Sequence, residues 1–251
     1  MANFKIFKLP LRFALSLIFS ANLAFAEVSG GFVGLEIGAG EANLKSTMIS
    51  FQDNTTLESI ELISGLKTPY YGLVAGYKQF FNRYLGLRYY ANVNVFHFTL
   101  VPKSCNATTC NVFAFSGNIT MINYGANIDF MGNFYSSESV DFGGFVGFGI
   151  GANSWVGKGI SDHERLYLSA MNRRDGSNLK LKKTGFDYWV NLGLRTNFAT
   201  HHSIEVVARV PLLKTTLLKD KFHNAGNGED YDMQTTIRNI YNISIRYAFS
   251  F

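Results

Sequence analysis

Apolar and polar positions alternate with a period of two in residues 235–251. The odd-numbered side is apolar and aromatic and includes Tyr241, Ile245 and Phe249, whereas the even-numbered side carries Arg238 and Arg246. Successive side chains of a β-strand leave opposite faces, so this period indicates a strand. Because its apolar face is strongly hydrophobic, we interpret the segment as the closing strand of a membrane β-barrel.

The same alternation recurs in seven further windows, residues 33–39, 71–77, 85–95, 122–130, 140–152, 186–198 and 204–212. All charged residues in the eight windows fall on the side opposite the apolar residues: Glu36, Arg88, Asp129, Asp141, Asp187, Arg195, Glu205, Arg209, Arg238 and Arg246. A soluble antiparallel sheet turns its charges to water. A transmembrane barrel turns them into its lumen, because a charge facing lipid at the midplane costs about 2–4 kcal/mol.

The pattern therefore predicts an all-β fold, an eight-stranded antiparallel transmembrane β-barrel. Long connections (40–70, 96–121, 153–185, 213–236) alternate with short ones (78–84, 131–139, 199–203). Barrels of this kind have short periplasmic turns and longer extracellular loops, so four loops are expected outside. Residues 57–66 in the first loop are compatible with a short amphipathic helix. Aromatic residues near the short turns are expected to form a periplasmic girdle: Phe80, Phe81, Tyr84, Phe130, Phe134, Phe198, Phe249 and Phe251.

Residues 1–26 have the composition of a cleaved secretory signal peptide, which leaves residues 27–251 as the barrel domain. Lys5, Lys8 and Arg12 precede a short apolar core, and Ala24-Phe25-Ala26 is a cleavage site of the A-x-A type. The alternative is an N-terminal membrane anchor. Without this segment the chain has 20 basic and 18 acidic residues, a net charge of +2 rather than +5. The basic pI is then no argument for a nucleic-acid partner, and none is expected.

Cys105 and Cys110 lie close together in the polar segment PKSCNATTC. In an exported chain this spacing favours a local disulfide that closes a short loop. A metal site is the weaker alternative.

The predicted lumen charges are five arginines and five carboxylates, a balanced set. An eight-stranded barrel is only wide enough for its own side chains, so we expect a salt-bridged, hydrogen-bonded plug. The alternative is a narrow, porin-like pore, although a selective channel more often carries charges of one sign.

Candidate catalytic and metal-binding residues are few. His201, His202, Ser203 and Glu205 are adjacent but fall at a predicted periplasmic turn, and His97 has no evident serine beside it. We expect no enzyme activity, no metal and no cofactor, with a lipid-modifying outer membrane enzyme as the remaining alternative. The third outer loop is net basic by four residues, which suggests contact with lipopolysaccharide phosphates or an acidic partner.

The sequence resembles the Helicobacter outer membrane protein family of the Hop/Hor type, as a small member. The resemblance is carried by residues 27–34 (EVSGGFVG), LGLRYY at 85–90, HHSIEV at 201–206 and YNISIRYAFSF at 241–251. It implies residence in the outer membrane of a Gram-negative bacterium, among outer membrane lipids and lipopolysaccharide. It also implies insertion by the barrel-assembly machinery, which reads a C-terminal aromatic strand such as Tyr247, Phe249 and Phe251.

Large members of that family carry extracellular domains that act as adhesins, and some members are porins. This chain has no large N-terminal insertion. We therefore expect a structural or surface-interaction role through the extracellular loops, adhesion included, with a host or surface ligand left open. The narrow pore remains the alternative.

Overall fold

The computed structural model describes residues 29–52, 55–100, 117–137, 140–162, 164–165, 180–199, 201–224 and 228–251. These residues form nine strands and one short helix: β1 (Gly30–Gln52), β2 (Thr55–Phe80), β3 (Leu85–Leu100), β4 (Gly117–Ser136), β5 (Val140–Val156), α3 (Lys158–Asp162), β6 (Thr184–Phe198), β7 (His202–Pro211), β8 (Thr215–Asn224) and β9 (Glu229–Ser250).

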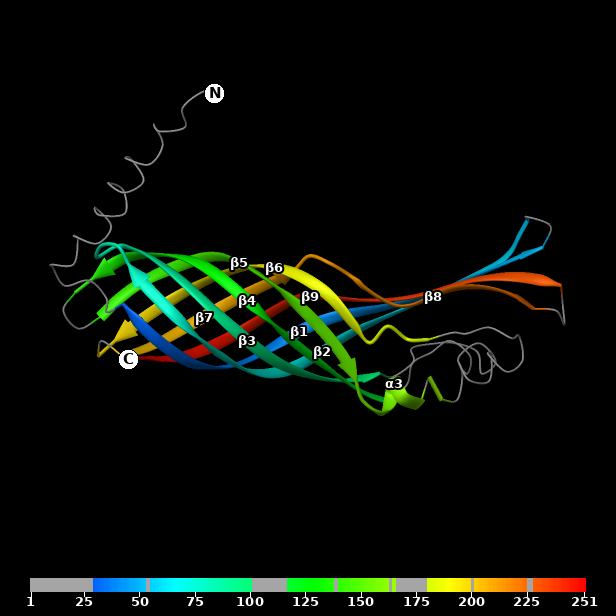
Figure 1. The fold of residues 1–251 in the computed structure, drawn as a ribbon, viewed down its shortest axis with the longest axis horizontal. Helices are drawn as coiled ribbons and strands as arrows, with labels where there is room; N and C mark the ends of the chain where they lie inside the picture. The colour runs from blue at the N-terminus through cyan, green and yellow to red at the C-terminus, as the bar shows by residue number, and fades with distance from the viewer. Residues whose placement is uncertain are drawn as a thin grey trace, which may run out of the picture.

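Eight of these strands close into a ring of antiparallel pairs (Figure 1). Each strand from β1 to β6 pairs with the next, β7 pairs with β9, and β9 pairs with β1. The predicted eight-stranded barrel is therefore confirmed, and the segment predicted to close it is β9. Closure leaves no unpaired backbone edge around the ring.

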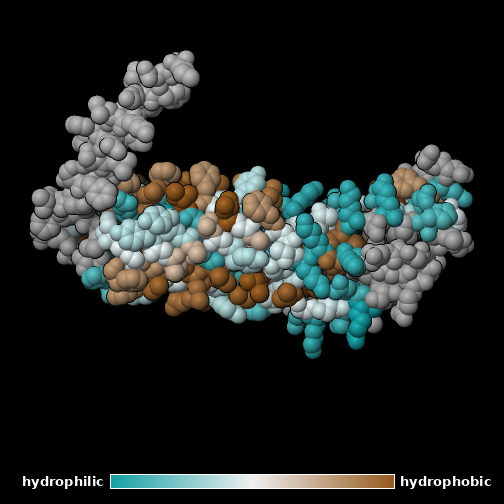
Figure 2. All heavy atoms as spheres, in the orientation of Figure 1, coloured by the Kyte–Doolittle hydropathy of each residue, from teal (hydrophilic) through white to brown (hydrophobic). Residues whose placement is uncertain are grey.

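The two faces of the wall differ as the alternation requires. Outward side chains such as Leu35, Ile37 and Phe148 are 60%, 68% and 58% exposed. Inward neighbours such as Glu36 and Asn191 are buried. Figure 2 shows apolar residues gathered over the barrel wall and hydrophilic residues beyond one of its ends. We call that end, which carries the long connections, the outer end.

At the outer end two hairpins continue the wall as an external sheet with the order β2-β1-β9-β8. β1 and β9 stay paired as far as Phe51 and Asp230, and β8 replaces β7 as the neighbour of β9. Figure 1 shows these hairpins projecting beyond the barrel. The amphipathic helix expected for residues 57–66 is wrong, because these residues continue β2 in register with β1.

A β-bulge in β9 corrects one prediction about the lumen. The β1–β9 register shifts between Glu41 and Ala42, which pair with Tyr241 and Asn239 and leave Ile240 as the extra residue. A bulge reverses the inward and outward positions that follow it. Arg238 was predicted to face the lumen, but it is exposed, whereas Asn239 is buried.

Buried apolar side chains form clusters near both ends of the bore. The cluster at the outer end includes Phe96, Phe98 and Trp155, and a second cluster nearer the inner end includes Phe80 and Met131. Phe80 was expected in the periplasmic aromatic girdle, but its side chain is buried and points into the barrel. The β2 register explains this, because Phe80 has the same parity as the inward residues of that strand.

The predicted signal peptide, residues 1–26, and the predicted Cys105–Cys110 disulfide fall outside the described residues, and both stay predictions. Among the residues that the structure describes, no helix has the length and apolar character needed to cross a bilayer.

Candidate functional site: the lumen and the external sheet

A chain of five buried ions crosses the middle of the bore. Arg246 of β9 donates to Glu36 of β1 through Nε at 2.7 Å and also through Nη2, and its Nη1 lies 3.1 Å from Glu205 of β7. Arg88 of β3 then binds Glu205 at 2.5 Å and Asp129 of β4 at 2.8 Å. Because three strands separate β3 from β7 in either direction around the ring, the Arg88–Glu205 pair ties opposite walls together.

Aromatic rings surround these guanidinium groups. The Cζ atom of Arg88 lies 4.6 Å from the Phe145 ring centroid and 5.2 Å from that of Tyr90, and Arg246 lies 4.8 Å from Tyr90. All five ions of the chain are at most 3% exposed. Burial of this kind is tolerated only because every charge is paired and hydrogen-bonded.

Amide side chains form a second layer toward the outer end. Asn92 donates to Asn123, Asn123 to Asn153 and Asn153 to Asp187, each at 2.8–2.9 Å, from β3 across to β6. Arg209 binds the Asn191 side chain at 3.1 Å and Asn123 at 3.3 Å. Through Asn123 and Asn153, these hydrogen bonds connect Arg209 to Asp187, two of the predicted lumen charges.

Trp189 occupies the space beside this layer, with its Nε1 2.7 Å from Asn127 Oδ1. A Cβ placed on Gly149 would lie 2.0 Å from Trp189 Nε1, so this glycine is required by the close approach of the indole. The indole therefore lies against the backbone of β5 at this level of the bore.

Asp141 and Arg195 are further predicted lumen charges, and Arg195 lies opposite Glu205 in the β6–β7 register. Asp141 accepts a hydrogen bond from Ser136 Oγ at 2.5 Å. Arg195 packs 5.4 Å from the Phe80 ring centroid and 3.0 Å from Met131 Sδ. Lys78 is also buried, at 4% exposure, and was missed because the sequence window ended one residue before it. Extending the same period of two by one position would have found it.

Aromatic residues gather at the outer mouth, above the polar layers. The ring centroids of Tyr70 and Phe96 are 4.4 Å apart, and the Phe98 centroid lies 6.1 Å from that of Phe96 and 6.0 Å from that of Trp155. Leu217 and Leu218 of β8 belong to the same cluster, so the external sheet contributes to the closure. These aromatic contacts were not evident from the sequence, which suggested loops in this region.

The outward face of the external sheet is polar. It carries a hollow of about 340 Å³ whose lining includes Lys45, Glu61, Lys214, Asp232 and Thr236. Two ion pairs border it, Lys45–Glu61 at 2.7 Å and Lys221–Asp232 at 3.2 Å.

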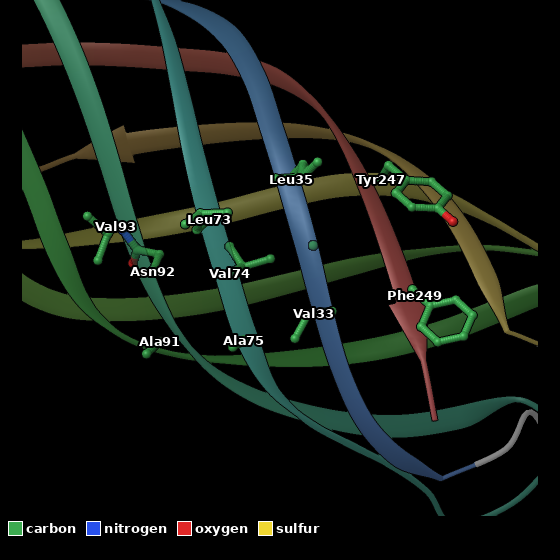
Figure 3. Close-up of a pocket in the computed structure, with 11 residues that line it drawn as sticks. Val33, Leu35, Leu73, Val74, Ala75, Ala91, Asn92, Val93, Tyr247 and Phe249 are labelled. Carbon is green, nitrogen blue, oxygen red and sulfur yellow. The ribbon is translucent and has the colours of Figure 1, made fainter.

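A second hollow, of about 430 Å³, lies in the apolar outer wall of the barrel (Figure 3). Ala75 and Ala91 occupy it between larger side chains such as Leu73, Val33 and Phe249. An almost wholly apolar lining of this kind suits hydrocarbon rather than a polar substrate.

The histidines considered for catalysis make other contacts. His201 Nδ1 lies 2.9 Å from Ser250 O and His202 Nδ1 lies 2.7 Å from Tyr247 OH, while Ser203 donates to Glu205. His97 lies on the outer wall between the hydroxyl groups of Tyr71 and Thr120, both at 3.1 Å. Among the described residues, no group of three His, Cys, Asp or Glu side chains could hold a metal ion.

Comparison with solved structures finds small outer membrane proteins. OprG from Pseudomonas aeruginosa is 13% identical with a TM-score of 0.48, and the match covers 90% of this chain and 98% of OprG. Neisserial surface protein A is 10% identical with a TM-score of 0.37, covering 89% and 98%. Ail of Yersinia pestis, in complex with the heparin analogue sucrose octasulfate, is 12% identical with a TM-score of 0.27, covering 86% and 99%.

No curated protein matches this chain significantly. A protein-family model described as "Helicobacter outer membrane protein" matches residues 72–251, which is more than half of the chain and extends from β2 to the end of β9. With the closed ring and its apolar outer wall, this match shows that the chain is an outer membrane β-barrel and that it belongs to the Helicobacter outer membrane protein family.

Proposed function

We propose that this protein is a closed, non-enzymatic outer membrane barrel that holds an external β-sheet at the cell surface for contact with a surface or host ligand. The observation that carries the proposal is the contrast between the bore of the barrel and the external sheet. The bore is filled by paired ions, amides and stacked aromatic rings, while two hairpins project beyond its outer end.

The filled bore supports a structural role for the lumen rather than the narrow pore. A conducting path requires a continuous line of water, and the ion chain from Glu36 to Asp129 spans the bore at mid-height. Opening a path would mean separating these pairs, each of which is costly to break when buried.

The external sheet supports the display role. In the external sheet β1 pairs with β2, β9 pairs with β8, and β1 and β9 pair with each other. This pairing makes its surface rigid compared with isolated loops. Its outward face combines lysines, carboxylates and hydroxyl groups around a hollow, which is suited to a polar ligand such as a glycan.

Insertion by the barrel-assembly machinery is part of the same proposal. Tyr247, Phe249 and Phe251 lie on the outward side of the last strand and are 40%, 38% and 68% exposed. An aromatic strand end of this kind is accessible before the barrel closes.

The test is to shorten the β1–β2 hairpin and measure attachment. Ser46 pairs with Leu62, so replacing residues 46–62 by an Asn-Gly turn keeps the barrel register and removes the hairpin tip. A non-adherent Gram-negative strain producing the full-length protein should attach to cultured epithelial cells several-fold better than the same strain with an empty vector. The shortened protein should fold, as judged by heat-modifiable migration in gels, and attachment should fall to background.

A matched control replaces Lys182, which lies outside the hairpin and is exposed, by glutamine. This change should leave attachment unaltered. If the full-length protein gives no attachment above background, or the shortened protein attaches equally well, the display role is wrong.

A further inference from the structure

We propose that the outward face at the base of the external sheet binds phosphate groups of the lipopolysaccharide that surrounds the barrel in the outer leaflet. The site is formed by Lys214 and Arg238, with Lys45 and the hydroxyl group of Thr236 beside them. It would anchor the sheet sideways to the membrane, and it does not depend on whether the hairpin tips bind a further ligand.

The first argument is the level of these residues. The outward positions of β9 are apolar up to Ile243 and Tyr241, which are 53% and 36% exposed, and the next outward side chain that is charged is Arg238. On the neighbouring segment the apolar series ends at Leu212, and Lys214 follows. Both cations therefore lie directly beyond the lipid-facing surface, at the level where the head groups of the outer leaflet begin.

The second argument is that Lys214 and Arg238 lie at the same end of the β8–β9 pairing. Thr215 of β8 pairs with Ile237 of β9, and Lys214 and Arg238 are the next residues toward the barrel on these two segments. Thr215 and Ile237 are buried, whereas Lys214 and Arg238 are exposed on the opposite face. On the other side of β9, Thr236 pairs with Lys45.

The third argument is charge balance on this face. Three carboxylates of the external sheet are ion-paired with a lysine, Glu41 with Lys67, Glu61 with Lys45 and Asp232 with Lys221, and Asp230 is hydrogen-bonded to His223. By contrast, Lys214, Lys219 and Arg238 have no ion-pair partner within the part of the chain that the structure describes. Among the described side chains of this face, the surplus of charge is therefore positive.

The fourth argument is the shape of the site. Lys214, Lys45 and Thr236 line the hollow of about 340 Å³ on this face, together with Thr47, Gln234 and two carboxylates, Glu61 and Asp232, which are ion-paired with Lys45 and Lys221. Ammonium, hydroxyl and amide groups are donors that suit phosphate oxygens. The hollow thus offers a recess in which a phosphorylated sugar can replace water.

The bulge at Ile240 links this site to the membrane. Without the extra residue, Arg238 would keep the parity of Arg246 and point into the barrel, as the alternation alone predicts. The bulge turns it to the side that continues the lipid-facing wall. A partner that reaches this side laterally lies in the membrane, which favours lipopolysaccharide over a soluble acidic glycan.

The test measures binding of bisphosphorylated lipid A to the refolded mature protein in detergent by native mass spectrometry. The probe variant is Lys214→Gln/Arg238→Gln, and the control is Lys158→Gln/Lys180→Gln, which removes the same charge from exposed positions elsewhere at the outer end. Each Lys or Arg near an anionic head group contributes about fivefold in affinity, so the probe variant should bind roughly 25-fold more weakly. Heat-modifiable migration verifies that both variants fold.

The control variant should bind lipid A like the wild type, and dephosphorylated lipid A should bind the wild type as weakly as the probe variant binds the intact lipid. Equal lipid A binding by wild type and probe variant would overturn the proposal. So would loss of binding to a soluble sulfated oligosaccharide in the probe variant with lipid A binding unchanged, because the patch would then serve a soluble glycan. Failure of the attachment experiment on the shortened hairpin leaves this result unaffected.

Discussion

Removal of Arg246 is the most informative perturbation of the lumen. Its guanidinium group binds both Glu36 and Glu205, and its side chain is wholly buried. The variant Arg246→Met keeps an unbranched apolar stem but removes the guanidinium group that lies over Tyr90, and it leaves Glu36 without its arginine. Glu205 retains Arg88 at 2.5 Å. Breaking a buried pair by removing one partner costs about 3–5 kcal/mol, and we expect a loss of this size in the free energy of unfolding.

The assay is urea unfolding of the refolded protein in lipid vesicles, followed by the fluorescence of Trp155 and Trp189, which are both buried in the bore. A second variant, Glu36→Gln/Arg246→Met, removes the uncompensated carboxylate as well. It should be more stable than Arg246→Met by roughly 1–3 kcal/mol, the usual coupling between contacting residues.

The control for this series is Arg165→Met. Arg165 forms an exposed ion pair with Asp162 at 3.4 Å, and such pairs contribute less than about 1 kcal/mol. If Arg246→Met is as stable as this control, or if the double variant is less stable than Arg246→Met, the ion chain does not hold the bore together and the reasoning fails.

Three further predictions follow from the same structure. In a background without the native cysteines, Arg238→Cys should react with a membrane-impermeant maleimide on whole cells and Asn239→Cys should not; the reverse pattern would disprove the bulge. Gly149→Ala should lower stability by about 1–3 kcal/mol in urea unfolding and change the Trp189 emission, because the new methyl group meets the indole; an unchanged spectrum and midpoint would contradict this packing. Phe96→Ala should cost about 3–5 kcal/mol and increase proteolysis of the outer end on intact cells, since it removes the centre of the outer cluster; unaltered protease resistance would show that this cluster does not close the mouth.

The strands of the barrel could be predicted because its wall has only two environments. Each outward position meets lipid and each inward position meets a crowded polar lumen, so a period of two persists in every strand. Glu36, Arg88 and Arg246 were assigned to the lumen from parity alone, and all three are buried there.

Features that depend on register could not be predicted in the same way. The pair Arg88–Glu205 joins residues 117 positions apart, and no local pattern indicates that their strands face each other across the bore. Arg238 was misplaced because a single extra residue reverses parity, and Ile240 has nothing in its residue type to signal a bulge. The sequence predicts loops where the external sheet lies, because the polar outward face of this sheet weakens the contrast on which the alternation depends.

The claim that the bore is closed is tested most directly by planar-bilayer conductance of the refolded mature protein, with Arg195→Ala/Arg209→Ala beside it. The closed barrel predicts no steady channels in the wild type. Leakage should appear only in the double variant, where two large side chains that fill the bore are lost. Steady channels in the wild type, with a size or ion preference altered by the two substitutions, would contradict the account and establish the pore.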